Sequence, residues 1–116
     1  DTERAVQTAI EMQRQIKIIN ERRTIDGLIP IKVGMGINQG TVVSGNIGSR
    51  DMMDYTVIGD TVNLGARLCS YASPDEIIVS NTVYEKTKTM FNYCKLDSIK
   101  VKGKRKKVEI YRINYD

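Results

Sequence analysis

Residues 54–68 read DYTVIGDTVNLGARL, and this stretch combines a predicted strand, a turn and the start of a predicted helix. Residues 54–58 are rich in aromatic and β-branched side chains, which are typical of strands. Gly59 interrupts that pattern, and Asp60 is a suitable N-cap because its carboxylate can accept backbone N–H groups of a first helical turn. The stretch therefore predicts a strand that leads directly into a helix.

The predicted helix after Asp60 has apolar side chains on two neighbouring stripes, as expected for a helix that packs on a sheet. The stripes are Val62, Ala66 and Cys69, and Leu64, Leu68 and Tyr71. Asn63 and Arg67 are four residues apart, so their side chains should project side by side from one helical face.

Length and composition limit the chain to one small globular domain or part of a larger one. It has 116 residues, of which 41% are hydrophobic and 28% are charged. No apolar run approaches the roughly 20 residues of a membrane span, and no signal-peptide pattern opens the chain. The sequence begins in a helix-like segment without an initial methionine, so we expect it to be a piece of a longer protein.

The cysteine and histidine content excludes several classes of site. Cys69 and Cys94 are the two cysteines, and the chain has no histidine. A zinc site would lack ligands, and catalysis by a Ser-His or Cys-His pair is excluded. We interpret both cysteines as reduced structural thiols, in preference to a disulfide or a reactive role.

The net charge of +4 comes from one local cluster, because residues 100–107 carry six lysine or arginine side chains and no acid. A nucleic-acid patch is one interpretation, but the run has no interleaved aromatic residues. A solvated turn between two strands is the alternative that we favour from composition alone, unless an anionic ligand is implied elsewhere.

The first half of the chain predicts a helix followed by a hairpin. Residues 2–22 show a helical period in their apolar side chains, as in a helix that covers a sheet. Residues 31–37 and 41–47 read as two strands joined by a short polar link, which favours a hairpin over 31–47. The glycines of this segment spell GxGxxxG at Gly34, Gly36 and Gly40. A phosphate-binding loop should run from a strand into a helix, so we interpret these glycines as points of close backbone approach or a bulge.

The second half predicts alternating short elements. Residues 75–79 should form a strand, and Ser80 or Asn81 should cap a helix that continues to Lys88. Residues 93–113 read as two strands around the basic turn at Gly103. The mixed order of helices and strands predicts an α+β fold.

These segments, in this order, resemble the class III nucleotidyl cyclases, enzymes that form cyclic AMP or cyclic GMP. The resemblance is densest in VGMGINQGTVVSGNIGS, residues 33–49, and in residues 54–68, and VKGK at 101–104 also fits. It implies a ferredoxin-like cyclase palm fold, of which residues 1–116 would be the C-terminal part of a single catalytic domain.

The resemblance also implies roles for five residues. Asn63 would orient the ribose, and Arg67 would stabilise the charge that develops when the ribose 3′-hydroxyl attacks the α-phosphate. Thr56 matches the position that contacts the purine, where a hydroxyl favours ATP over GTP. Lys102 matches a lysine that contacts the triphosphate, and Arg50 is a weaker candidate because the alignment around it is loose. The family has alanine more often where this helix has Gly65, a change worth roughly 1 kcal/mol of helix stability.

Two Mg²⁺ or Mn²⁺ ions are implied as cofactors, with ligands outside this chain. Family members bind them with two aspartates that precede the opening helix, and neither Asp54 nor Asp60 occupies one of those positions. The implied partners are ATP and a second cyclase domain, because each active site is built from both subunits of a dimer. We expect no nucleic-acid partner, membrane contact only through segments not in this chain, and a cytoplasmic catalytic domain. A guanylyl cyclase and a catalytically degenerate domain used for dimerisation or nucleotide sensing are the alternatives.

Overall fold

The computed structural model of the chain describes residues 1–40, 43–47, 54–58, 60–100 and 107–116, with the backbone alone for 43–47, 54–58 and 60. The described helices are α1 (Thr2–Ile25), α2 (Asp60–Tyr71) and α3 (Asn81–Thr87). The described strands are β1 (Met35–Ile37), β2 (Val43–Ile47), β3 (Asp54–Ile58), β4 (Ile77–Ser80), β5 (Asn92–Lys95) and β6 (Ile110–Asn114). This mixture of helices and strands agrees with the predicted α+β class.

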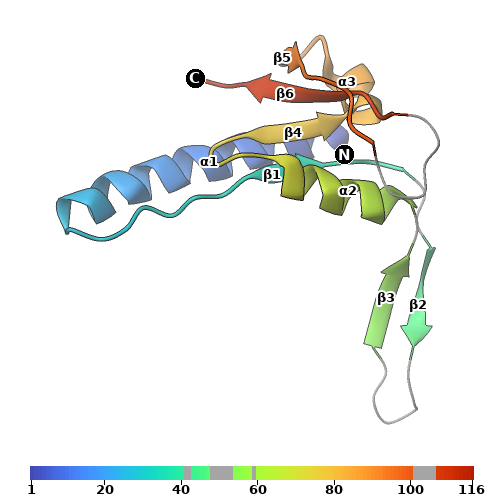
Figure 1. Ribbon diagram of the computed structural model, residues 1–116, viewed down its shortest axis with the longest axis horizontal. Coiled ribbons are helices and arrows are strands. Elements are labelled where there is room, and N and C mark those ends of the chain that lie inside the picture. Colours follow the sequence, from blue (N-terminus) through green and yellow to red (C-terminus); the bar gives the residue numbers. More distant parts are fainter. Residues whose placement is uncertain (41–42, 48–53, 59, 101–106) are drawn as a thin grey trace.

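The described strands form two separate sheets. The larger has the order β1-β4-β6-β5, in which β1 runs parallel to β4 and the other neighbours are antiparallel. The smaller sheet is the antiparallel pair of β2 and β3. This hairpin extends away from the four-stranded sheet, beyond the N-terminal end of α2 (Figure 1).

The four-stranded sheet lies between two helical layers. Side chains alternate along a strand, so Ile77 and Val79 of β4 face one layer and Ile78 faces the other. The first layer is built by α1 and α3, and its buried cluster is Val6, Ala9, Ile10, Ile77, Val79, Val83, Tyr111 and Ile113. The second layer is built by α2, and its buried cluster is Leu64, Leu68, Ile78, Ile99 and Ile110.

Helix α1 covers the sheet with its N-terminal half only. Asp1 caps it by accepting a hydrogen bond from the Arg4 backbone amide at 3.3 Å. Its buried residues are Val6, Ala9, Ile10 and Gln13. The rest of the helix extends past the sheet (Figure 1), so Ile18 is 57% exposed and Ile19 is 45% exposed. The helix is confirmed, but the predicted apolar stripe covers the sheet only where the sheet lies beneath it.

The predicted hairpin over residues 31–47 is wrong. Strand β1 begins at Met35 and pairs with β4, with Gly36 opposite Ile78, whereas β2 pairs with β3. Helix α1 supports the segment that leads into β1, because Gln13 Nε2 donates a hydrogen bond to the Val33 carbonyl at 2.9 Å. The short polar link after β1 therefore leads out of the four-stranded sheet and does not return the chain beside β1.

The C-terminal half follows the prediction more closely. Ser80 caps α3 by accepting a hydrogen bond from the Val83 amide, and the helix ends at Thr87. Strands β5 and β6 form the predicted antiparallel pair, extended by a bridge between Ile99 and Val108. The basic turn at Gly103 lies outside the described residues. Cys69 and Cys94 are both free thiols, as predicted.

Candidate functional site

Helix α2 presents the two polar residues that the sequence singles out. Leu64 is 7% exposed and Leu68 is fully buried against the sheet, whereas Asn63 and Arg67 are both exposed. A spacing of four residues in an α-helix brings Asn63 and Arg67 onto the same face. The predicted side-by-side pair is therefore present on the solvent side of α2.

Arg67 differs from several other arginines in its surroundings. Arg14, Arg22 and Arg112 each form an ion pair with a carboxylate. Within the described part of the chain, Arg67 has no such partner. An exposed guanidinium without a carboxylate partner keeps its donors available for a phosphate or another anion.

Two apolar stripes were predicted on α2, and only one of them packs as expected. Leu64 and Leu68 are buried, but Tyr71 of the same stripe is 42% exposed. Val62 of the other stripe is 37% exposed, and Ala66 and Cys69 are also exposed. The helix contacts the sheet through the narrow Leu64–Leu68 ridge and through the backbone of β1.

Glycines bring β1 directly against α2. A Cβ atom on Gly36 would lie 2.5 Å from the Cys69 amide nitrogen and 2.7 Å from Leu68 Cβ. A Cβ atom on Gly34 would lie 2.6 Å from the Ala72 carbonyl oxygen. These distances are too short for any side chain, so both positions require glycine. The interpretation of the glycine pattern as a close backbone approach is confirmed.

Asn38 continues this contact toward the start of α2. Its Nδ2 donates a hydrogen bond to the Thr61 carbonyl oxygen at 2.9 Å. A Cβ atom on Gly65 would lie 3.9 Å from Asn38 Cβ, an ordinary contact distance. Sequence reasoning assigned Asn38 to a hairpin link and missed this contact. The available signal was its even spacing from Gly34, Gly36 and Gly40.

The other predicted site residues are only partly described. Thr56 lies in β3 opposite Gly45, and its side chain is outside the described residues. Arg50 and Lys102 both lie outside the described residues. Asp60 is the first residue of α2, one position earlier than the predicted helix start, and its side chain is not described either.

The described residues do not fit a metal centre. Across 1–40, 61–100 and 107–116, no group of three or more His, Cys, Asp or Glu side chains lies together. Several carboxylates in this part of the chain pair with basic side chains, as Asp116 does with Arg14.

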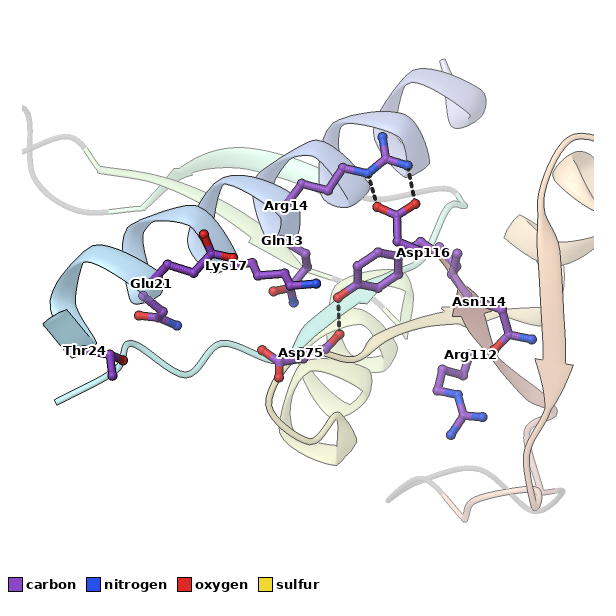
Figure 2. Close-up of a pocket in the computed structure, with 12 residues that line it drawn as sticks. Gln13, Arg14, Lys17, Glu21, Thr24, Asp75, Arg112, Asn114 and Asp116 are labelled. Atoms are coloured by element: carbon purple, nitrogen blue, oxygen red, sulfur yellow. Dashed lines mark hydrogen bonds and ion pairs between the residues drawn. The ribbon is translucent and has the colours of Figure 1, made fainter.

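A groove in the described part of the chain lies on the α1 side of the sheet and is lined by none of the residues of α2. It has a volume of about 1070 Å³ and lies between α1 and the end of β6. Figure 2 shows Arg14 of α1 reaching Asp116, with its Nη2 atom 2.9 Å from Asp116 Oδ1. This hydrogen bond lowers the pKa of the Asp116 carboxyl. Neither Asn63 nor Arg67 lines the groove, so it is distinct from the predicted site.

Among the described helices, none combines the length and apolar character that crossing a bilayer requires.

Comparisons with known proteins agree on one family. The profile of the adenylate and guanylate cyclase catalytic domain matches residues 1–115. The adenylate cyclase of Anabaena cylindrica is 33% identical over an alignment 126 residues long, gaps included, which covers 97% of this chain and 24% of that protein. The chain thus spans about a quarter or less of the curated relatives that it matches.

Solved structures show the same fold. The adenylyl cyclase CyaB from P. aeruginosa superposes with a TM-score of 0.86 at 30% identity, over 100% of this chain and 60% of that chain. The guanylyl cyclase Cya2 superposes with a TM-score of 0.85 at 36% identity, over 97% of this chain and 57% of that chain. The described elements therefore form part of a cyclase catalytic domain, as predicted. The chain belongs to the adenylate and guanylate cyclase catalytic domain family.

Proposed function

We propose that the chain is the C-terminal part of a single adenylyl cyclase catalytic domain that converts ATP to cyclic AMP and pyrophosphate. The observation that carries the proposal is the exposed pair of Asn63 and Arg67 on α2, in a chain whose family is that of the nucleotidyl cyclases. In the proposed reaction, a bond forms between the ribose 3′-oxygen and the α-phosphorus. The bond from that phosphorus to the pyrophosphate oxygen breaks.

Arg67 and Asn63 take the positioning and charge-stabilising roles in this proposal. Negative charge on the phosphoryl oxygens increases in the transition state, and a fixed guanidinium stabilises it most at that moment. Asn63 carries an amide that can both donate and accept, which suits a ribose hydroxyl or ring oxygen. Their common face on α2 supports a single bound nucleotide contacting both residues.

The choice of ATP rests on Thr56. A threonine hydroxyl can accept a hydrogen bond from the adenine amino group. Lys102 is proposed to contact the triphosphate, and Arg50 is a weaker candidate for the pyrophosphate end. Other members of the basic run would contribute a favourable electrostatic field.

A guanylyl cyclase is the second candidate function. The specific observation in its favour is the 36% identity to the guanylyl cyclase Cya2, compared with 30% to the adenylyl cyclase CyaB. A catalytically degenerate domain that dimerises or senses nucleotide is the non-enzymatic alternative. It differs from an enzyme in lacking the aspartates that bind metal in active members of the family.

The remaining parts of the site are proposed to come from outside this chain. The ligands of the two divalent metal ions, Mg²⁺ or Mn²⁺, would precede α1, since the described residues do not fit a metal centre. A second cyclase domain would complete the site in a dimer. We further propose that the catalytic domain is cytoplasmic, where ATP is available, and that any membrane contact is made by other segments.

The test is the product formed by the full-length protein with Mn²⁺ and either ATP or GTP. Cyclic AMP from ATP, with little product from GTP, is the expected result. Product from GTP alone would favour the guanylyl cyclase and contradict the argument from Thr56. No product from either triphosphate would favour the degenerate domain.

A further inference from the structure

We propose that Asn38 is a positioning residue that fixes the register of α2 against β1, and thereby the location of Asn63 and Arg67. The inference rests on the proposed function for the roles of those two residues. Asn38 is not expected to touch the nucleotide. Its effect would come from the hydrogen bond between its side-chain amide and the Thr61 carbonyl at 2.9 Å.

Alternate residues of the segment around β1 run along α2 in the opposite direction. Gly34 meets Ala72, Gly36 meets Leu68 and Cys69, and Gly40 meets Thr61. Asn38 lies between the last two contacts, beside Gly65 and Thr61. The residues Gly34, Gly36, Asn38 and Gly40 therefore form one line, here called the β1 track, beneath one face of α2.

Asn38 is the one member of the β1 track that has a side chain. The glycines bring the helix close, but they offer few directional contacts along the helix axis. The burial of Leu64 and Leu68 is strong but non-directional, so it tolerates small shifts of the helix. The hydrogen bond from Asn38 to the first turn of α2 supplies the missing constraint on translation and rotation.

The geometry of the bond suits this role. Within α2, the Thr61 carbonyl also has the amide of residue 65 as its helical partner, and a carbonyl oxygen has two lone pairs. Asn38 can therefore occupy the second position without breaking the helix. Asn63 and Arg67 lie about 200–240° around the helix from Thr61, at about 100° per residue. The track thus holds the back of the helix while the candidate pair faces away from it.

The first test compares variants of the full-length protein in cyclase assays. Asn38→Asp keeps the shape but removes the donor, and Asn38→Ala removes the side chain. Both should lower kcat by on the order of tenfold to a hundredfold with little change in KM, because misplacement of reacting groups by about 1 Å has effects of this size. Asn38→His should recover much of the activity, because its Nδ1 can donate from nearly the position of the Asn Nδ2.

Two controls separate positioning from general loss of stability. Asn20→Ala removes another asparagine whose side chain bonds the backbone, in this case the amide and carbonyl of Ile31, which belong to the loop after α1. Gly65→Ala alters α2 itself at a position with room for a methyl group. Both should leave kcat near the wild-type value. An Asn38→Ala enzyme with normal kcat, or an equal loss in Asn20→Ala, would overturn the proposal.

A second measurement keeps this proposal separate from the proposed function. Hydrogen–deuterium exchange of the α2 amides should be faster in Asn38→Asp than in wild type and unchanged in Asn20→Ala. If the wild-type protein forms no cyclic nucleotide, the proposed function fails, while the exchange experiment still tests whether the Asn38–Thr61 hydrogen bond holds α2 in place. Unchanged exchange in Asn38→Asp would overturn this proposal.

Discussion

Arg67 is exposed and has no carboxylate partner among the described residues, whereas Arg14, Arg22 and Arg112 each form an ion pair. Arg14 is bound to Asp116 and Glu11, and these hydrogen bonds raise the pKa of its guanidinium. Surface ion pairs of this kind contribute little to stability in solvent. A guanidinium that no described carboxylate binds can offer its donors to an anionic ligand.

We expect Arg67→Ala to lower kcat of the full-length enzyme by orders of magnitude, since the guanidinium acts mainly when charge develops in the transition state. The measurement is steady-state kinetics together with circular dichroism and gel filtration, which should show a folded protein of unchanged size. Arg22→Ala, on α1 at a 78% exposed side chain, is the matched control and should retain normal kcat. A nearly normal turnover number in Arg67→Ala would remove this residue from the proposed site.

Substitution by alanine should have opposite effects on stability at Gly36 of β1 and at Gly65 of α2. Gly36→Ala should destabilise the chain by about 1–3 kcal/mol, because the methyl group would clash with the Cys69 amide and Leu68. Gly65→Ala should stabilise it by about 0.5–1 kcal/mol, because alanine is the better helix former and its Cβ would only touch Asn38. Urea unfolding followed by circular dichroism measures both. Equal effects of the two substitutions would contradict the close packing of β1 on α2.

Tyrosines next to α3 predict a loss of stability at alkaline pH. Burial raises the pKa of Tyr93, whose hydroxyl lies 2.6 Å from Thr87 Oγ1, and burial likewise raises the pKa of Tyr111. The folded state therefore holds these protons more tightly than the unfolded state. The contribution of these two tyrosines to stability should be fully present below about pH 10, the ordinary tyrosine pKa, and should be lost as the pH rises through their higher folded-state pKa values.

Lys88 also titrates at alkaline pH, and a hydrogen bond to Glu85 raises its pKa. The variant Tyr93→Phe is therefore needed to separate the contribution of Tyr93 from that of Lys88. Urea midpoints measured at about pH 8 and about pH 11 should differ less in Tyr93→Phe than in wild type. The same fall in both proteins would exclude a contribution from Tyr93.

Local patterns predicted the elements better than their partners. Residues 54–58 form a strand as predicted, and Ser80 caps α3, because side-chain type and capping are properties of neighbouring residues. The hairpin over 31–47 failed because β1 pairs with β4, where Met35 lies opposite Ile77. Nothing in the sequence near β1 specifies so distant a partner.

The same distinction holds for the candidate site. The common face of Asn63 and Arg67 follows from helical spacing within α2, and the structure shows both residues exposed. The contact of Asn38 joins it to a backbone carbonyl, which carries no signature in the sequence of Thr61. The even spacing of Asn38 from the glycines could have marked this position, but the sequence does not identify its hydrogen-bond partner.

The chain as a whole covers 60% and 57% of the CyaB and Cya2 chains, respectively, which makes it part of a catalytic domain. In the described four-stranded sheet, β1 is an edge strand. The C-terminal half of α1 exposes several apolar side chains, among them Ile18, Ile19 and Ile25. Unpaired edges and exposed apolar surface both favour association. These features fit a fold that is completed by further polypeptide.

We expect the 116-residue chain alone to form no cyclic AMP from ATP and Mn²⁺, even if it associates with itself. The physical reason is that its described residues do not fit a metal centre, and copies of one chain repeat the same residues. The measurement is cyclic AMP formation by the purified chain, alone and mixed with a complementary N-terminal part of the domain. Robust product from the chain alone would mean that Asp54, Asp60 or another acid of this chain binds metal.

The β1 track also has a consequence for how this segment can change during evolution. Gly34, Gly36, Asn38 and Gly40 meet α2, while Met35 and Ile37 pack against the opposite layer. Inserting or deleting one residue here would exchange the two sets and press Met35 and Ile37 into the space that admits no Cβ atom. Between residues 34 and 40, insertions or deletions should therefore be tolerated only two residues at a time, whereas the loop at 26–32, which precedes the track, is under no such constraint from α2.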